Sequence, residues 1–260
     1  MQEDIKSSDF HILVDAGGVS RGSDPQSLLL LQYLVKGLGW LNYSAINLGY
    51  REWSTKPTFL KKLELEQQAP FLCANVYLKD SGKTVFPPFL LREIKTERSA
   101  KRLPFKKLPV AVLGLTDNLM AQLFVNRPGE PVLEYRDPLE VAKVLVPQIR
   151  EEADLVILLY YGKFQKLQTI LTEVPGIDVA VLGGESYMLN QQGSANFRTI
   201  AVTSQSMGKY VGILHLKMDK KKNIISSSVK QVPLDEHIQD APQFQQLVEE
   251  YEAELKKPRS

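Results

Sequence analysis

Five short runs of the sequence are almost wholly apolar, and segments with helical spacing lie between most of them. A strand is a continuous apolar run when both of its faces are buried, as in a parallel sheet covered by helices. Strands that alternate with helices predict parallel pairing in an α/β architecture. The five runs are FHILVD (10–15), SAINL (44–48), PVAVLGL (109–115), DLVILLYY (154–161) and IDVAVL (177–182).

The first predicted helix follows the turn sequence SDPQ. Ser23 would cap its N-terminus, and Gln26 three residues later completes a capping-box pattern. Leucine and valine then recur at helical spacing until Gly37 and Gly39, which should end the helix.

Two further helices are predicted in the second half of the chain, at DPLEVAKVLVPQIREEA (137–153) and KFQKLQTILTEV (163–174). Pro147 should kink or break the first of them, because proline cannot donate the helical hydrogen bond. The last third contains FRTIAVTSQ, YVGILHLKM and NIISSSVKQV, which predict consecutive antiparallel strands. An amphipathic helix, QFQQLVEEYEAELKK, closes the chain.

Composition limits the classes of function that the chain can have. The 260 residues are 43% hydrophobic and 24% charged, which is typical of a globular protein, and a net charge of +2 does not predict a nucleic-acid partner. The basic segment 92–107 is either a solvated loop or an anion-binding patch. Cys73, the single cysteine, lies in an apolar run and is predicted to be a buried, inert thiol. No apolar run reaches the ~20 residues of a membrane span, and the polar start lacks a signal-peptide core.

Candidate site residues follow the predicted strands, each time next to a glycine. Ligands of open α/β sheets bind at the carboxyl ends of the strands, so these segments should converge on one edge. The segments are Asp15 to Gly18, the sequence LGYREW with Tyr50, Arg51 and Glu52, the sequence Tyr160–Tyr161–Gly162, and Gly183 to Tyr187 with Glu185.

The chemistry of these segments does not favour a metal site or a familiar catalytic centre. None of the three histidines, His11, His215 and His237, belongs to a strand end. Metal sites need clustered histidines and carboxylates, whereas this edge offers only glutamates and an aspartate. A P-loop, a Rossmann glycine fingerprint and a GxSxG elbow are all absent from the sequence.

The order of segments resembles the catalytic domain of the 5′-nucleotidase branch of the calcineurin-like metallophosphoesterases, from about residue 10 to residue 255. ILVDAGG is similar to the family's strand ending in DAGD, and LNYSAINLGYREW to the segment ending in GNHE. PFLCANVYLKDSGKTVFPPF, LPVAVLGLT, DLVILLYYG, VPGIDVAVLGGESY and TSQSMGKYVGILHLKMD match further family segments in the correct order. The resemblance implies a four-layer α/β/β/α sandwich with two mixed sheets, and a centre of two divalent metals that clamps a phosphate.

The chain departs from the family at every metal-binding position that can be aligned. The bridging aspartate of DAGD falls on Gly18, and the asparagine and histidine of GNHE fall on Tyr50 and Arg51. The histidine of the His-x-Gly strand falls on Tyr160, and the two histidines of GGHSH fall on Glu185 and Tyr187. The family's opening Asp-x-His strand has no counterpart. Only the scaffold glycines remain, with Glu52 at the position of the family's acid.

We therefore expect one metallophosphoesterase-like domain over residues 1–260, without the family's C-terminal nucleotide-binding domain and without a metal cofactor. Three functions stay open: a non-catalytic module that binds a small anion or a protein partner, an active phosphoesterase with unusual ligands, and a structural component of a larger exported assembly. In the first case Asp15, Gly18, Tyr50, Arg51, Glu52, Tyr160, Glu185 and Tyr187 would line the binding site. The resemblance implies a location outside the cytoplasm.

Overall fold

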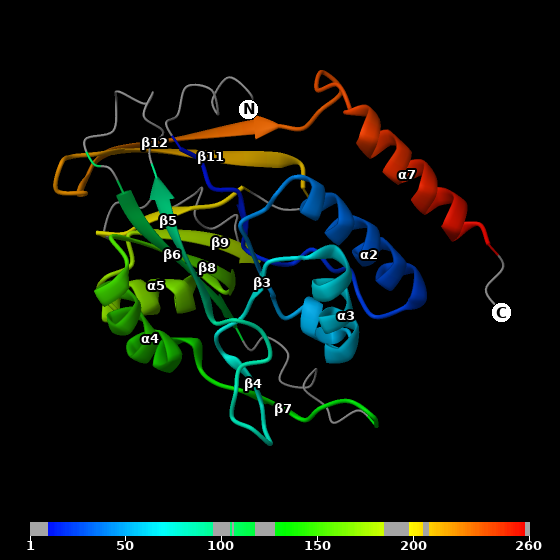
Figure 1. Ribbon diagram of the computed structural model, residues 1–260, viewed down its shortest axis with the longest axis horizontal. Coiled ribbons are helices and arrows are strands. Elements are labelled where there is room, and N and C mark those ends of the chain that lie inside the picture. Colours follow the sequence, from blue (N-terminus) through cyan, green and yellow to red (C-terminus); the bar gives the residue numbers. More distant parts are fainter. Residues whose placement is uncertain are drawn as a thin grey trace.

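The computed structural model describes residues 10–95, 105, 107–117, 128–184, 198–204 and 208–257. Its largest sheet has five strands in the order β10-β9-β8-β6-β5 (Figure 1). Four of them are parallel, and β5 runs antiparallel to β6 at one edge. The bounds are β5 (Phe89–Lys95), β6 (Lys107–Thr116), β8 (Leu155–Gly162), β9 (Val179–Gly184) and β10 (Ile200–Val202).

A second layer of strands covers one face of this sheet. It contains the parallel sheet β1-β2-β3 and the antiparallel pair β11-β12. Apolar residues of β1 and β11, among them Val14, Leu214 and Leu216, pack against the inner residues of the five-stranded sheet. The bounds are β1 (Val14–Asp15), β2 (Ala45–Asn47), β3 (Phe71–Leu72), β11 (Tyr210–Met218) and β12 (Ile224–Pro233).

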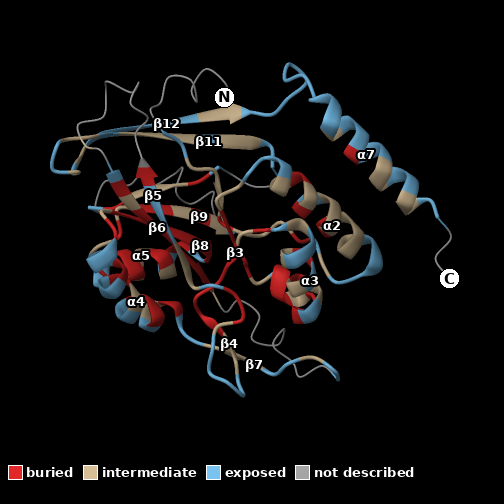
Figure 2. Cartoon of the chain, in the orientation of Figure 1, coloured by how far each residue is buried: buried red, intermediate tan, exposed pale blue. Residues whose placement is uncertain are grey.

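Helices form the two outer layers. On the far face of the five-stranded sheet, α4 (Pro138–Glu152) and α5 (Phe164–Glu173) bury Ala142, Ile149 and Leu167 against β6 and β8. On the other side, α2 (Pro25–Trp40) and α3 (Pro57–Gln67) pack against β2 and β3. The predicted four-layer α/β/β/α sandwich is confirmed, with buried residues concentrated between the layers (Figure 2). A separate antiparallel pair joins β4 (Val76–Leu78) and β7 (Leu133–Tyr135).

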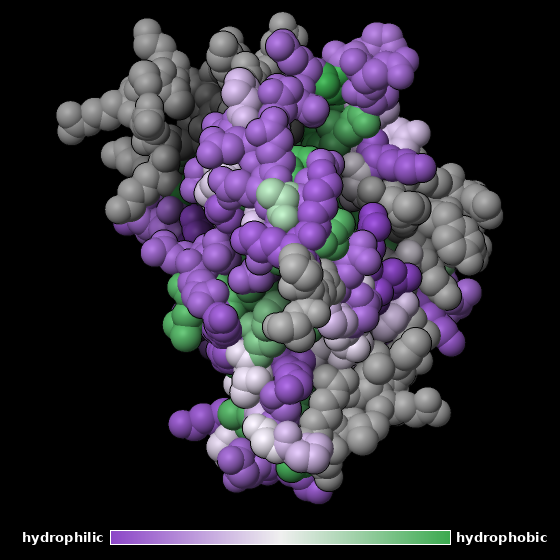
Figure 3. Space-filling model, turned by 90° about the vertical axis from the view of Figure 1, so that its right-hand side faces the viewer, coloured by the Kyte–Doolittle hydropathy of each residue, from purple (hydrophilic) through white to green (hydrophobic). Residues whose placement is uncertain are grey.

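The C-terminal helix α7 (Pro242–Leu255) lies on α2 and completes that side of the molecule (Figure 1). Trp40 and Phe244 contact each other at a ring-centroid distance of 5.8 Å, and Lys36 pairs with Glu250 at 2.9 Å. Figure 3 shows this face, where hydrophilic side chains predominate and apolar groups are scattered among them.

The structure corrects both ends predicted for the first helix. Asp24, not Ser23, caps α2: its carboxylate accepts hydrogen bonds from the backbone N–H groups of Gln26 and Ser27, both at 3.0 Å. The helix also continues through Gly37 and Gly39 to Trp40. Gly37 is buried where α7 packs against this helix, and an added Cβ would lie 3.4 Å from Leu247. Tertiary contact therefore outweighs the low helix propensity of glycine.

Pro147 does not break α4, which runs on to Glu152. The neighbouring Val146 and Ile149 are fully buried, so packing holds the helix in place although one backbone hydrogen bond is lost. The predicted antiparallel arrangement is also wrong for one strand, because β10 pairs parallel with β9 at the edge of the large sheet. The sequence of a three-residue strand does not indicate whether it pairs parallel or antiparallel with its neighbour. The antiparallel pair β11-β12 is as predicted.

Three other segments differ from the expectations. Only Val14–Asp15 of the first predicted strand pairs in a sheet, so His11 lies before the strand rather than in it. Most of the basic segment 92–107 lies outside the described residues. Cys73 is confirmed as a buried thiol, and burial raises its pKa to about 12. No helix among the described residues is long and apolar enough to cross a membrane.

Candidate functional site

The carboxyl ends of four strands come together as predicted. Asp15 ends β1, Gly49 follows β2, Tyr161 lies near the end of β8, and Gly183 lies near the end of β9. We call the group formed by Asp15, Gly18, Gly49, Tyr50, Glu52 and Tyr161 the strand-end cluster.

Glu52 holds two loops of the strand-end cluster together. It begins a short 3-10 helix (Glu52–Ser54), and its side chain is buried. One carboxylate oxygen accepts hydrogen bonds from the backbone N–H groups of Gly49, at 2.8 Å, and Gly18, at 3.1 Å. The other oxygen accepts from the N–H of Ser20 at 2.6 Å. The loop after β1 is thus tied to the loop after β2 through a single carboxylate.

Tyr161 fills the space between the strand ends. A Cβ placed on Gly18 would lie 2.3 Å from its ring, and one on Gly49 or Gly183 would lie 2.5 Å or 2.7 Å from it. Such distances leave no room for a side chain at any of the three positions. The ring also contacts Tyr50, with centroids 5.1 Å apart. Three glycines from three strand ends therefore accommodate one aromatic ring.

Tyr160, the candidate chosen from the sequence, faces the other way. Successive side chains of a strand point to opposite faces, so only one of two adjacent tyrosines can enter the cluster. Tyr160 is fully buried in the core formed with α4 and α5, and burial raises the pKa of its hydroxyl. Tyr161 lies in one of the segments predicted from the sequence but was not among the predicted site residues. The glycines at the neighbouring strand ends indicated that a bulky side chain could lie between them.

Tyr50 and Arg51 lie at the outer side of the cluster. Arg51 is exposed and Tyr50 is half-buried, and a hydrogen bond from Arg51 to Tyr50 raises the pKa of the guanidinium group. The arginine therefore stays positively charged and open to solvent beside two tyrosine rings.

The two carboxyl groups of the cluster have raised pKa values. Burial raises the pKa of Glu52 to about 7, and the negative charge of Asp15 adds to this shift, whereas the backbone N–H donors oppose it. Burial also raises the pKa of Asp15 to about 6, against the hydrogen bond that its carboxylate accepts from Gly17 at 2.7 Å. Both groups are therefore easier to protonate than ordinary surface carboxylates.

Two buried asparagines brace the strands beneath the cluster, and the sequence analysis did not single out either. Asn47 donates to the carbonyl groups of Ala16 and Leu115, at 3.0 and 2.9 Å, and so joins the two layers of strands. Asn75 donates to the carbonyl groups of Thr116 and Arg136 and accepts from the N–H of Thr116. A polar residue inside an apolar run was the signal for both.

The described residues do not fit a dinuclear metal centre. Gly18 offers no donor, Tyr50 and Arg51 stand where a ligand asparagine and a histidine were expected, and Glu52 already accepts three backbone hydrogen bonds. Within the described part of the chain, no three His, Cys, Asp or Glu side chains gather as a metal ion requires. Glu185 and Tyr187 lie outside the described residues.

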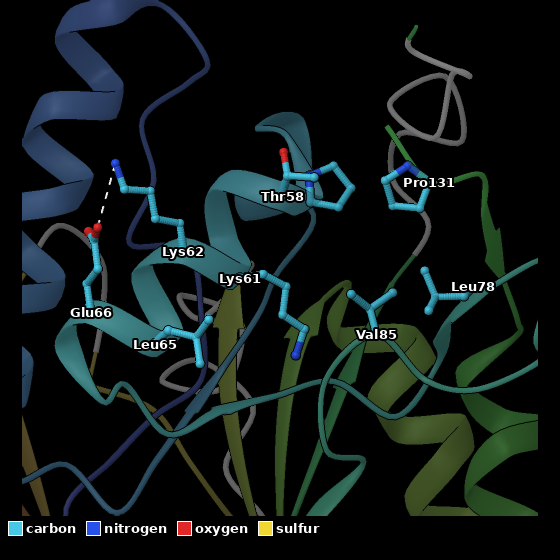
Figure 4. A pocket seen from close by; sticks show the side chains of 9 residues that line it. Thr58, Lys61, Lys62, Leu65, Glu66, Leu78, Val85 and Pro131 are labelled. Carbon is cyan, nitrogen blue, oxygen red and sulfur yellow. Dashed lines mark ion pairs between the residues drawn. The ribbon is translucent and has the colours of Figure 1, made fainter. Parts of the chain in front are cut away.

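A groove of about 600 Å³ lies elsewhere, along the outer side of α3 (Figure 4). Leu65, Leu78 and Val85 contribute apolar surface, and Lys62 pairs with Glu66 at 3.7 Å along its edge. Lys61 points into the groove but pairs with Glu64 at 2.7 Å, so the groove has no strong charge of one sign.

Comparison with solved structures identifies the fold. The calcineurin-like phosphoesterase YfkN from Bacillus subtilis superposes with a TM-score of 0.79 over 98% of this chain and 88% of that chain, at 20% sequence identity. The fold is that of the calcineurin-like phosphoesterases. A 5′-nucleotidase precursor from Thermus thermophilus matches 97% of this chain and 51% of its own, with a TM-score of 0.72 and 17% identity.

Comparison with curated sequences finds related proteins of the same kind. UshA from Salmonella pullorum is 28% identical over 152 residues, which are 56% of this chain and 25% of UshA. A snake venom 5′-nucleotidase from Gloydius brevicauda is 26% identical over 263 residues, covering 91% of this chain and 42% of the relative. The chain thus spans less than half the length of these relatives. No protein-family model matches the sequence. The resemblance to 5′-nucleotidases and calcineurin-like phosphoesterases is confirmed, and its relatives include snake and human proteins as well as bacterial ones.

Proposed function

We propose that this chain is a non-catalytic interaction module built on the calcineurin-like phosphoesterase fold. The observation that carries the proposal is the position of Tyr161, whose ring occupies the space between the ends of β1, β2 and β9. A dinuclear centre needs open coordination positions for a phosphate and a water. The tyrosine ring supplies none.

The remaining side chains of the cluster support the same proposal. Glu52 has both carboxylate oxygens engaged with backbone N–H groups, so a metal would have to displace hydrogen bonds that hold two loops together. Arg51 adds a fixed positive charge beside them. At ~4 Å and an effective dielectric of ~20, two unit charges of like sign repel by about 4 kcal/mol. We infer that the chain binds no pair of divalent metals.

Anion binding, if the module has it, would involve Arg51 and Tyr50 at the outer side of the cluster. A guanidinium group forms paired hydrogen bonds with phosphate or carboxylate, and tyrosine supplies a hydroxyl and an aromatic face. Phosphate titration followed by calorimetry tests this, because Arg51→Gln should abolish any heat of binding that the wild-type protein shows.

Hydrolysis assays test the central proposal. The purified protein is incubated with Mn²⁺ or Zn²⁺ and then with p-nitrophenyl phosphate or AMP, and bound metal is measured in parallel. We expect hydrolysis at the rate of the blank and far fewer than two metal ions per chain. The variant Asp15→Asn, purified identically, is the control for contaminating phosphatases. Turnover that chelator abolishes and that Asp15→Asn lacks would refute the proposal.

An active metal-dependent phosphoesterase with unusual ligands is the second candidate, and the names of the relatives favour it. Several of the curated relatives are called 5′-nucleotidases, and one is called a trifunctional nucleotide phosphoesterase. The same assay separates the two functions.

A part in a larger exported assembly is a further version of the interaction module. The family resemblance suggests a location outside the cytoplasm. Fractionation of the native host, with detection of this chain by antibody, tests the location, and cross-linking before lysis tests the assembly.

A further inference from the structure

Strand β12 is an edge strand with an unusually open surface. Among the described residues its strand ladder is formed with β11, and the Gln231 side chain also donates to the carbonyl of Thr203. Residues 225–230 are all exposed, including Ile225 at 55% and Val229 at 51% (Figure 2). Edge strands usually carry charges, prolines or bulges that prevent pairing with another chain. The exposed stretch contains one charged residue, Lys230.

The register of the β11-β12 pair shows which backbone groups face away from β11. The N–H of Leu234 donates to the carbonyl of Lys209 at 2.8 Å, one step beyond the pair Tyr210–Pro233. Hydrogen-bonded and non-hydrogen-bonded pairs alternate along an antiparallel ladder. The backbone N–H and C=O groups of Ser227, Val229 and Gln231 therefore point to the free edge.

Two features limit this edge, and they lie at nearly equal distances from Val229. On one side, the register shifts opposite Lys217 and Met218, so the ladder is irregular around residues 225 and 226. On the other side, Pro233 occupies an outward position and has no N–H to donate. The usable edge is thus Ser227 to Gln231, with Val229 at its centre.

We propose that β12 pairs antiparallel with β12 of a second copy of this chain, about a two-fold axis at Val229. The two valines then face each other, Ser227 lies opposite Gln231 of the partner subunit, and Lys230 lies opposite Ser228 of the partner subunit. No like charges meet across the axis, and each Pro233 lies at the irregular end of the other strand, where an N–H is not required. A two-fold axis needs a self-complementary surface, which this strand provides.

The pairing extends the two-stranded sheet to four strands and covers the exposed valines. The contact is small, because five residues of each strand supply it, so we expect a reversible dimer whose population depends on concentration. The inference does not depend on whether the chain is catalytic.

Sedimentation velocity tests the dimer at protein concentrations from about 1 to 300 μM, which bracket the affinity of a small interface. The wild-type mass should rise with concentration from 29.3 kDa toward twice that value. Val229→Lys places two positive charges opposite each other and should weaken the dimer at least about tenfold. Ser227→Pro removes an outward N–H but none that bonds to β11, and it should have the same effect.

Val144→Lys is the matched control, since it makes the same change at a 60% exposed position on α4 and should dimerise like the wild type. Circular dichroism checks that each variant is folded. If Ser227→Pro does not fold, the result for Val229→Lys decides the test. A wild-type protein that stays monomeric over the whole concentration range overturns the proposal. Edge variants that dimerise as the wild type does also overturn it.

Discussion

Glu52→Gln should change how the stability of the protein depends on pH. In the folded protein the pKa of Glu52 is raised from 4.5 to about 7, mainly by burial. A raised pKa means that the folded state holds the proton more tightly than the unfolded state. Glu52 therefore contributes most to stability below pH 4.5, and this contribution is lost as the pH rises through about 7.

The size of the effect follows from the shift. Each pKa unit corresponds to 1.36 kcal/mol, so ionisation of Glu52 should lower the free energy of unfolding by about 3 kcal/mol between pH 4 and pH 8. Glutamine cannot ionise, so this loss should be absent from the variant. Glutamine also keeps only one acceptor oxygen. At least one of the N–H groups of Gly18, Ser20 and Gly49 then loses its partner, at a cost of about 1–3 kcal/mol at every pH.

Urea unfolding of both proteins at pH values from 4 to 8 measures the two effects separately. The constant offset reports the lost hydrogen bond, and the slope reports the titration. Relative to the wild type, the variant should gain about 3 kcal/mol from low to high pH. Glu66→Gln makes the same substitution at an exposed position on α3 and is the matched control. A flat difference, or a variant that loses stability with pH, would show that the three N–H donors outweigh burial and would refute the reasoning.

Three further predictions concern the packing around the strand ends. In urea unfolding, Tyr161→Ala should destabilise the protein by about 3–5 kcal/mol and Gly49→Ala by about 1–3 kcal/mol. In the double variant, Gly49→Ala should cost much less, because the ring that the new Cβ would meet is gone. Additive costs would contradict the contact. Asn75→Ala should lower the free energy of unfolding by about 3 kcal/mol, since the carbonyl and the N–H of Thr116 both lose their hydrogen bonds to the Asn75 side chain. An unchanged free energy of unfolding would argue against a structural role for these hydrogen bonds. Cys73 should resist a thiol reagent at pH 8 until denaturant is added, because burial holds its pKa at about 12, and rapid labelling of the folded protein would count against this.

Much of the fold could be predicted because it rests on patterns that extend over many residues. The apolar runs at 109–115 and 154–161 form the central strands β6 and β8, and the helices predicted at 137–153 and 163–174 are α4 and α5. The errors arose where a tertiary contact decides. Gly37 stays helical because α7 packs against it, and β10 runs parallel because of the neighbour it meets.

The convergence of the strand ends could be predicted, but the side chain that lies between them was not identified. An alignment of motifs assigns a residue to a position in the family, and it chose Tyr160. The direction of a side chain at a strand end depends on the local backbone, and the structure turns Tyr161 toward the cluster instead. The hydrogen bonds of Glu52 were equally invisible in the sequence, because Gly18 and Ser20 precede it by more than thirty residues.

The interaction between Tyr161 and its three glycines explains how the strand ends pack together. Glycines at strand ends leave space, and that space would cost stability if it stayed empty, because lining atoms would lose their contacts. A tyrosine ring restores those contacts and adds the stacking with Tyr50. Glu52 in turn satisfies backbone N–H groups of the two loops that frame the ring. Once the ring is in place, any larger residue at Gly18, Gly49 or Gly183 would clash with it, and at Gly18 a φ of +89° favours glycine independently of the ring. The ring therefore accounts for Gly49 and Gly183, and the presence of these glycines does not by itself indicate a working phosphoesterase.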